Sequence, residues 1–249
     1  MRVASSCEPH FSQLATRNSQ LIMDPESEKR AVATRATEFV KDGMAVGLGT
    51  GSTAEHAVRD LAERVAHGLD IVGVPTSEKI ARLARELGIP ITSLEERPLL
   101  DITLDGADEM DLVTFNAIKG RGGALLREKL VALASRVETI MVDETKVVQR
   151  LGERAFLPVE VVTFGWANTR KAVAALGCEP KLRLAADGRP FVTDSGNYLL
   201  DCHFPSIDDP TSLAAEIKGI TGVVEHGLFI GLIHRVIVAR AGSIEVIER

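Results

Sequence analysis

The chain has 249 residues, of which 45% are hydrophobic, and it carries a formal net charge of -6 with a pI of about 5.6. This composition supports one large or two modest folded domains and argues against a wholly disordered chain. The acidic balance argues against a nucleic acid or an anionic membrane as the main partner. It leaves room for an anionic small substrate in a locally positive pocket.

The three cysteines, Cys7, Cys178 and Cys202, are odd in number and far apart, and no C-x-x-C spacing is present. This usage argues against a zinc site and a disulfide framework and fits a reducing cytosol. No apolar run approaches the length that spans a membrane. We therefore expect a cytoplasmic protein with no metal site and no membrane partner.

Residues 1–23 are rich in Ser and carry a single Glu. We interpret them as a disordered leader or a start-site extension. A targeting peptide is the alternative, because Arg and Ser enrichment with few acids is typical of transit segments. The next stretch, "DPESEKRAV", predicts a helix over about 25–41, with Asp24 as its N-cap and Pro25 at the first helical position.

Strands and helices alternate up to about Gly152. Apolar runs predict strands over 44–49, 70–76, within 99–108 and over 138–144, and helical spacing predicts helices over 52–68, 77–88 and 125–135. This alternation is typical of a parallel sheet with helices on both faces. We expect a Rossmann-like α/β catalytic domain of residues 24–153 and 232–249, in which one or two C-terminal strands return to the first sheet.

The pattern changes after Gly152. Strands are predicted over 158–164, 180–185, 198–204 and 223–231, and helices over 167–177 and 209–222. The order β-α-β-β-α-β is that of the ferredoxin-like split unit. The sequence therefore predicts a smaller α+β domain over residues 154–231.

Three unusual loops follow predicted strands, at the edge where open parallel sheets bind ligands. The first, "GLGTGST" (47–53), offers glycines and a helix start to an anion. "GTGSTA" matches the dinucleotide pattern G-x-G-x-x-A, but the second strand ends in "VPTS", without the required carboxylate. A phosphate cradle is therefore favoured over an NAD cradle, and a tight glycine turn with a capping Ser is the alternative.

The second loop, "DGADEM" (105–110), places Asp105, Asp108 and Glu109 close together, where like charges raise one another's pKa. The third, "KGRGGALLREK" (119–129), carries Lys119 and Glu128. Taken singly, these stretches also fit a solvated acidic turn and a mobile loop before a solvated helix face. Together the three loops offer an anion anchor, proton-transfer carboxylates and a cation for an oxyanion. That set suits proton transfer beside the carbonyl of a phosphorylated sugar.

Over about residues 25–249 the chain resembles the type A ribose-5-phosphate isomerase family. The resemblance rests on "VGLGTGSTA", "LDGADE", "KGRGGALLREK", "VDETK" and "LPVEV", in the family's order and spacing, and on the later "FVTDSGNYLLD" and "GVVEHGLF". It implies an aldose–ketose isomerase that interconverts D-ribose 5-phosphate and D-ribulose 5-phosphate in the non-oxidative pentose phosphate pathway. It also implies no metal or nucleotide cofactor and a homodimer or homotetramer.

The resemblance assigns the site residue by residue. Glu128 matches the catalytic base, with Asp105, Lys119 and Asp108 as further catalytic residues. The matched substrate-binding positions are Thr50, Gly51, Ser52, Thr53, Gly106, Ala107, Gly120, Arg121, Gly122, Lys146 and Lys29. One departure is Arg121, because some members have glycine there; its side chain points to solvent or adds attraction for the phosphate.

The mechanism we expect gives each catalytic residue one part. Asp105 assists opening of the sugar ring, Glu128 removes the C2 proton and returns it to C1 through a cis-enediolate, and Lys119 stabilises the oxyanion. Asp108 orients a sugar hydroxyl or the base. Two alternatives stay open: coenzyme A transfer with Glu128 as the nucleophile, and a non-catalytic sugar-phosphate sensor.

Overall fold

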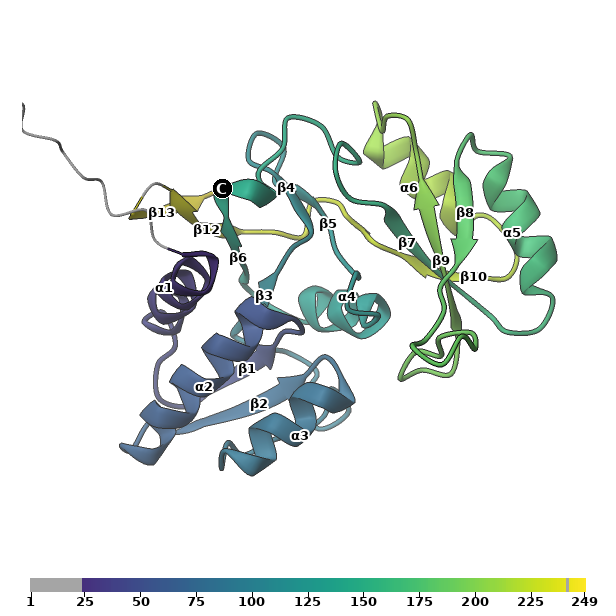
Figure 1. Ribbon diagram of the computed structural model, residues 1–249. Coiled ribbons are helices and arrows are strands. Elements are labelled where there is room, and N and C mark those ends of the chain that lie inside the picture. The colour runs from purple at the N-terminus through teal and green to yellow at the C-terminus, as the bar shows by residue number, and fades with distance from the viewer. Residues whose placement is uncertain (1–23, 241) are drawn as a thin grey trace, which may run out of the picture.

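The structure is a computed structural model that describes residues 24–240 and 242–249 (Figure 1). The predicted leader, residues 1–23, and with it Cys7, lies outside the described residues. In the part of the chain that is described, no helix is long and apolar enough to cross a membrane.

A six-stranded sheet forms the centre of the larger part, in the order β13-β12-β6-β3-β1-β2. Its strands are β1 (Met44–Leu48), β2 (Ile71–Pro75), β3 (Ile102–Gly106), β6 (Glu138–Asp143), β12 (Arg235–Arg240) and β13 (Ser243–Glu248). Neighbours pair in parallel except β12 and β13, which form an antiparallel hairpin at the edge. The predicted parallel sheet and the return of the C-terminal strands to it are both confirmed.

Three helices cover one face of this sheet: α1 (Pro25–Thr37), α2 (Ser52–Ala66) and α3 (Glu78–Glu86) (Figure 1). The carboxylate of Asp24 accepts hydrogen bonds from the N–H groups of Glu26 and Ser27, which confirms the predicted N-cap. The helix α1 ends at Thr37, earlier than predicted. After Thr37 the chain forms a tighter 3-10-type turn, in which the Val40 N–H donates to the Thr37 carbonyl at 3.0 Å.

The opposite face is covered by α4 (Leu125–Leu133) and by a three-stranded sheet, β11-β5-β4. The strands β4 (Glu109–Asp111), β5 (Asn116–Ile118) and β11 (Leu228–Phe229) are very short and were not predicted as such. The predicted strand 223–231 is in fact two, β10 (Val223–His226) and β11, which belong to different sheets. They part at Gly227, where a Cβ would lie only 2.3 Å from the Lys119 carbonyl oxygen, so a side chain would not fit.

A separate four-stranded antiparallel sheet, β10-β7-β9-β8, lies beyond α4 (Figure 1). It contains β7 (Leu157–Val161), β8 (Glu179–Leu182) and β9 (Tyr198–His203), and it carries the helices α5 (Trp166–Ala174) and α6 (Pro210–Lys218). The chain order β7-α5-β8-β9-α6-β10 is the predicted β-α-β-β-α-β. The boundaries proposed for the two domains, 24–153 with 232–249 and 154–231, stay a prediction.

Candidate active site

One cavity of about 330 Å³ opens at the carboxyl edge of the main sheet, between the loops that follow β1, β3, β5 and β6. All three loops singled out in the sequence reach it. The residues that line it are Lys29, Thr50, Gly51, Ser52, Thr53, Gly106, Ala107, Asp108, Lys119, Gly120, Arg121, Gly122, Glu128, Met141, Val142, Asp143 and Lys146. Of the candidate site residues, Asp105 alone does not line the cavity, because it is fully buried.

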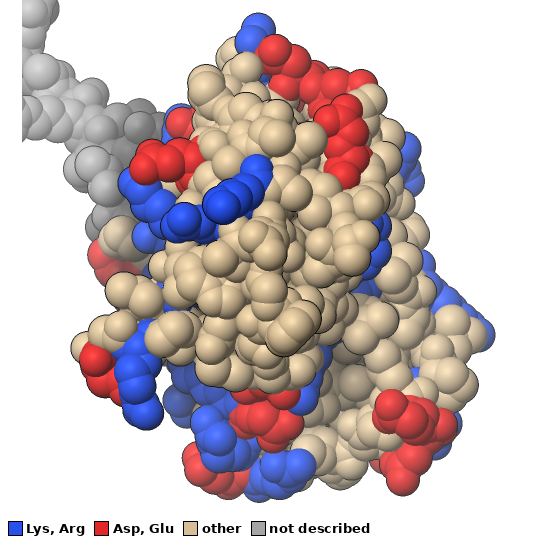
Figure 2. All heavy atoms as spheres, turned by 90° about the vertical axis from the view of Figure 1, so that its right-hand side faces the viewer, with Lys and Arg blue, Asp and Glu red and all other residues tan. Residues whose placement is uncertain are grey.

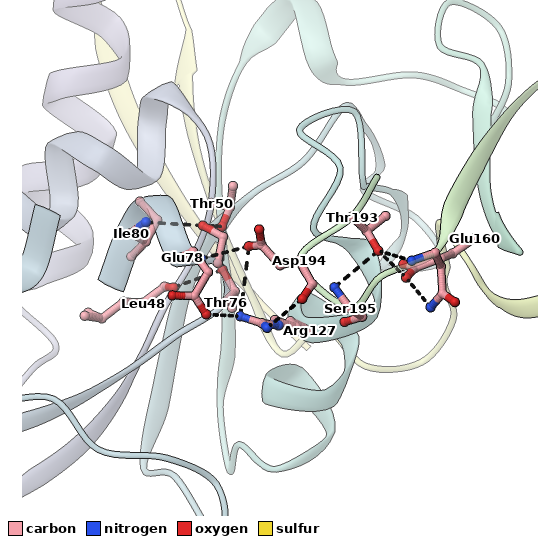
Figure 3. Close-up of polar contacts among 12 residues, drawn as sticks. Leu48, Thr50, Thr76, Glu78, Ile80, Arg127, Glu160, Thr193, Asp194 and Ser195 are labelled. Atoms are coloured by element: carbon pink, nitrogen blue, oxygen red, sulfur yellow. Dashed lines mark hydrogen bonds and ion pairs between the residues drawn. The ribbon is translucent and has the colours of Figure 1, made fainter. Parts of the chain in front are cut away.

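The first loop presents a helix start to the cavity. Gly51 is the N-cap of α2, with φ at +119°, and no side chain caps the helix there. The first-turn N–H groups therefore face the cavity with the positive end of the helix dipole. The Thr50 hydroxyl is turned away, towards Thr76 Oγ1 at 2.7 Å and Ser77 Oγ at 2.9 Å (Figure 3). The residues that follow β2, Thr76 and Ser77, carry hydroxyl groups. A dinucleotide-binding site would have an Asp or Glu at this position to bind the ribose.

Lys119 lies at the floor of the cavity among buried carboxyl groups. Its Nζ is 2.9 Å from Asp105 Oδ2 and 3.7 Å from Glu128 Oε1, and it donates a hydrogen bond of 2.5 Å to the Gly106 carbonyl. The three side chains are between 0% and 3% exposed. Asp105 Oδ1 also accepts the N–H groups of Thr50 and Gly106, at 3.1 and 2.7 Å. One carboxylate thus fixes the ammonium group and two cavity loops.

Burial and the neighbouring charges shift the pKa values of this cluster. Burial raises the pKa of Asp105 although Lys119 opposes the shift, and burial raises the pKa of Glu128 to about 8, with the charges of Asp105 and Asp108 adding to the rise. Burial by itself would lower the pKa of Lys119, but the carboxylates around it raise that pKa above its ordinary value. Lys119 therefore stays a cation, and Glu128 can exchange a proton near neutral pH.

Glu138 is a buried member of the same cluster that the sequence reasoning missed. It begins β6, faces the same side of the sheet as Ile140, and is 0% exposed. Both of its carboxyl oxygens lack a hydrogen-bond partner among the described residues, and burial raises its pKa well above the ordinary value. The available signal was strand alternation, which puts residue 138 on the same buried face as residues 140 and 142.

Two acidic side chains of the second loop, Asp108 and Glu109, point in different directions. Asp108 lines the cavity, and its Oδ2 accepts the Arg121 N–H at 2.9 Å, which joins the second loop to the third. Glu109 points elsewhere, although the sequence analysis grouped it with Asp105 and Asp108 in one loop. Its carboxylate accepts the N–H groups of Gly152, Arg154 and Ala155 at 2.5–2.6 Å. That part of the interpretation was wrong, because the pleat of β4 turns Glu109 away from the cavity to bind another loop.

Three further cationic side chains line the cavity. Lys29 from α1 reaches the cavity and forms an ion pair of 2.6 Å with Glu26. Lys146 ends the single 3-10 turn Glu144–Lys146 after β6, and Arg121 lies exposed on the third loop. Asp143 was not singled out in the sequence; it accepts the Thr145 N–H at 2.9 Å and so shapes the turn that carries Lys146.

The residue before Glu128 connects α4 to two other elements (Figure 3). Arg127 Nη1 lies 2.9 Å from Glu78 Oε1 in α3, and Arg127 Nη2 donates to the Asp194 carbonyl at 3.1 Å. Asp194 belongs to the "VTDSGN" stretch, and its carboxylate accepts the Glu78 N–H at 2.8 Å. The helix that bears Glu128 is therefore held from both the α3 side and the small-sheet side.

The described residues contain no group of three or more His, Cys, Asp and Glu side chains placed to hold a metal ion. The cavity contains a carboxyl group with a raised pKa (Glu128) and a buried ammonium group beside it (Lys119). It is also lined by lysines and a helix start, which favour an anion. This combination can abstract a proton from a carbon next to a carbonyl and stabilise the resulting oxyanion.

The chain is similar to known proteins along most of its length. The family model described as ribose 5-phosphate isomerase A (phosphoriboisomerase A) matches residues 72–243. Ribose-5-phosphate isomerase A from Gloeobacter violaceus is 54% identical over 225 residues, which are 90% of this chain and 97% of the relative. The relative of the same name from Roseiflexus castenholzii is 53% identical over 228 residues, 91% of this chain and 97% of its own.

Solved structures agree. Ribose 5-phosphate isomerase A from Methanocaldococcus jannaschii superposes with a TM-score of 0.87 at 38% identity, covering 91% of this chain and 100% of that one. A D-ribose-5-phosphate isomerase in complex with phospho-erythronic acid gives a TM-score of 0.88 at 38% identity, with the same coverage. The residues that the family model matches include the second and third cavity loops. The chain therefore belongs to the ribose 5-phosphate isomerase A family.

Proposed function

We propose that this chain interconverts D-ribose 5-phosphate and D-ribulose 5-phosphate through an enediolate, with Glu128 as the base. The observation that carries the proposal is the placement of the Glu128 carboxyl. It is buried at the cavity floor, has a pKa of about 8, and lies 3.7 Å from the ammonium of Lys119. A base next to a fixed cation is what proton abstraction beside a carbonyl needs.

The phosphate group binds at the cationic end of the cavity. Lys29, Lys146 and the first turn of α2 supply positive charge and N–H donors, and Ser52 and Thr53 add hydroxyls. Arg121 adds a further cation at the rim of the cavity. Gly51, Gly106, Ala107, Gly120 and Gly122 let the sugar approach the backbone closely. This end holds the substrate while the reacting carbons lie over Glu128.

Two aspartates have different roles in this proposal. Asp108 lines the cavity, so we assign it the contact with the ring oxygen and sugar hydroxyls. Asp105 lies beneath the cavity against Lys119, so we assign it the fixing of that ammonium group rather than direct ring opening. After ring opening, Glu128 takes the C2 proton, and Lys119 stabilises the oxyanion that forms at O1. The hydroxyl proton of O2 then passes to O1, and Glu128 returns its proton to C1, which leaves the carbonyl at C2.

Proton NMR of ribose 5-phosphate in D₂O with EDTA tests this function, using the wild type and Glu128→Gln. We expect ribulose 5-phosphate with loss of the C2 proton signal for the wild type, and a rate lower by about 10²–10⁴-fold for the variant. A wild type that binds the sugar without turnover would favour the sensor. A variant as fast as the wild type would remove Glu128 as the base.

We also propose a homodimer or homotetramer in the cytoplasm. Among the described residues, the part that carries the small sheet exposes large apolar side chains, with Phe164 93% and Val192 54% exposed. The face seen in Figure 2 is largely uncharged in its middle, with charged side chains gathered towards its edges. Exposed apolar side chains that form a patch often mark interfaces. Light scattering after size exclusion tests the assembly; a monomer at micromolar concentration would contradict it.

A further inference from the structure

The third loop of the cavity is held from its outer side by a residue of the small antiparallel sheet. Arg183 directly follows β8. Its Nη1 donates a hydrogen bond of 2.9 Å to the Arg121 carbonyl and one of 3.4 Å to the Gly120 carbonyl. Both acceptor residues line the cavity, whereas Arg183 does not. The guanidinium group therefore contacts the active-site loop without reaching the substrate.

Arg183 is itself firmly placed. Its Nε donates to both carboxylate oxygens of Asp201 in β9, at 3.1 and 3.0 Å, and its side chain is only 13% exposed. The Cζ atom also lies 5.5 Å from the Phe156 ring centroid and 5.9 Å from that of Phe191. A paired, stacked guanidinium presents its remaining N–H groups in a fixed direction.

Because each peptide bond is planar, the contact of Arg183 with a carbonyl also sets the direction of the N–H group that follows it. In a trans peptide the C=O and the following N–H point to opposite sides. The Gly120 carbonyl faces Arg183, and the Arg121 N–H on the other side of that peptide donates to Asp108 Oδ2 at 2.9 Å. The Arg121 carbonyl also faces Arg183, which directs the Gly122 N–H away from Arg183. Gly122 itself lines the cavity.

The chain around these peptides has little stiffness of its own. Gly120 has φ at +100° and Gly123 has φ at +85°, a region that glycine enters without a steric penalty. The one hydrogen bond that closes the turn runs from the Gly123 N–H to the Gly120 carbonyl, at 2.9 Å. Contacts from outside the turn therefore add to its order: Arg183 donates to the carbonyls of Gly120 and Arg121, and Asp108 accepts the Arg121 N–H.

We propose that Arg183 is a positioning residue for the isomerase reaction: held by Asp201, it orients the peptides of residues 120–122 so that Lys119, Asp108 and the loop N–H groups face the reacting atoms. This inference rests on the proposed function. It joins the small sheet to catalysis, a link that no residue of the cavity lining provides. It also gives a role to the strand pair β8–β9, which carries Arg183 and Asp201.

Steady-state kinetics and chemical rescue test the inference on the full chain, with wild type, Arg183→Ala, Arg183→Lys and Asp201→Asn. The matched control is Arg189→Ala, because Arg189 lies in the same region and pairs with Asp187 but is 84% exposed and away from the cavity. We expect kcat for Arg183→Ala to fall by about 10–100-fold, the scale of a misplacement near 1 Å, while KM changes by less than about threefold. Millimolar guanidinium should restore part of kcat in Arg183→Ala, and Arg189→Ala should match the wild type.

The outcomes separate the two proposals. An inactive wild type would overturn the proposed function, and with it the inference about Arg183. An active wild type with unchanged kcat in Arg183→Ala would overturn the inference alone, and so would a change confined to KM. If Arg183→Ala does not fold, Arg183→Lys decides, because lysine keeps the charge but lacks the rigid planar fork of N–H donors that sets their direction. Full activity in a folded Arg183→Lys would count against the positioning role.

Discussion

The ammonium nitrogen of Lys119 lies 2.9 Å from Oδ2 of Asp105, and both side chains are almost completely buried. Around this pair, Glu128 and Glu138 add two further buried carboxyl groups. One buried cation can offset the charge of one carboxylate, so the remaining carboxyls bind protons more readily than in water. We therefore expect the protonation state of this cluster to affect both the pH dependence of the rate and the pH dependence of the stability.

The rate should rise with pH. Glu128 must be ionised to remove a proton from carbon, and burial raises its pKa to about 8. Below that pH most of the enzyme carries a neutral Glu128, so kcat/KM should fall about tenfold for each pH unit. Initial rates between about pH 6.5 and pH 9 in EDTA give the profile. A rate that stays flat over this range, as expected for a base with the ordinary pKa of 4.5, would contradict the assignment of Glu128 as the base.

Lys119→Met should abolish turnover and also destabilise the fold. Removing one partner of a buried ion pair leaves a charge in an apolar setting, at a cost of about 3–5 kcal/mol. The pKa of Asp105 is already raised, and it should rise further without Lys119. A carboxyl whose pKa is higher in the folded than in the unfolded chain stabilises the fold at low pH and loses that contribution as pH rises through the folded value.

The stability deficit of Lys119→Met should therefore shrink as pH falls, because Asp105 takes up a proton. Urea unfolding at several pH values measures it. The double variant Lys119→Met with Asp105→Asn should recover part of the stability at neutral pH. A deficit that is independent of pH would argue that lost packing, and not the unpaired carboxylate, is responsible.

The sequence allowed the parallel sheet and the location of the site to be predicted, because both depend on local patterns. Strand and helix periods alternate over several turns of chain, and glycine loops with charged residues stand out at the strand ends. Lys119 and Glu128 were found in this way, with the family resemblance assigning their roles. The cavity lining in the structure includes nearly all of those candidates.

Other features depend on contacts between distant segments. The strands β4 and β5 have three residues each, too few to show a period. Asp105 and Asp108 look alike in the sequence, yet Asp105 is buried against Lys119 and Asp108 faces the cavity, a difference that only the packing of β5 and α4 creates. Glu138 begins a predicted strand, where a charged residue is normally exposed, but in the folded chain its side chain is completely buried.

Replacing Glu138 with an apolar residue should stabilise the protein. Both of its carboxyl oxygens are buried and lack a hydrogen-bond partner among the described residues. An unsatisfied buried polar group costs about 1–3 kcal/mol, so Glu138→Met should raise Tm by about 2–12 °C for a chain of this size. The gain should grow as pH rises, because the pKa of Glu138 is raised and the wild type loses stability when this group ionises.

Glu160 supplies the matched control for that experiment. It is also buried and its pKa is also raised by burial, but its Oε1 accepts hydrogen bonds from Thr193 at 2.8 Å and Asn197 at 2.9 Å (Figure 3). Glu160→Met should therefore lower Tm, since it leaves two donors without a partner. Calorimetry of both variants compares a satisfied with an unsatisfied carboxyl. A loss of stability in Glu138→Met as large as in Glu160→Met would show that Glu138 has a partner after all.

The first and second loops approach each other closely at Gly49. A Cβ on Gly49 would lie 2.3 Å from Cγ of Asp105 and 2.6 Å from its Cα, so Gly49→Ala must displace the strand end that carries Asp105. Because Asp105 holds Lys119 and the Thr50 N–H, kcat should fall by about 10²-fold, as expected for a shift near 1 Å in the catalytic groups. Gly43→Ala is the control: Gly43 has φ at +80° and open space around it, so alanine costs about 1–2 kcal/mol of stability there without touching the site. Below its unfolding temperature Gly43→Ala should keep full kcat. Equal kcat in Gly49→Ala and wild type would show that the close contact between these loops is dispensable.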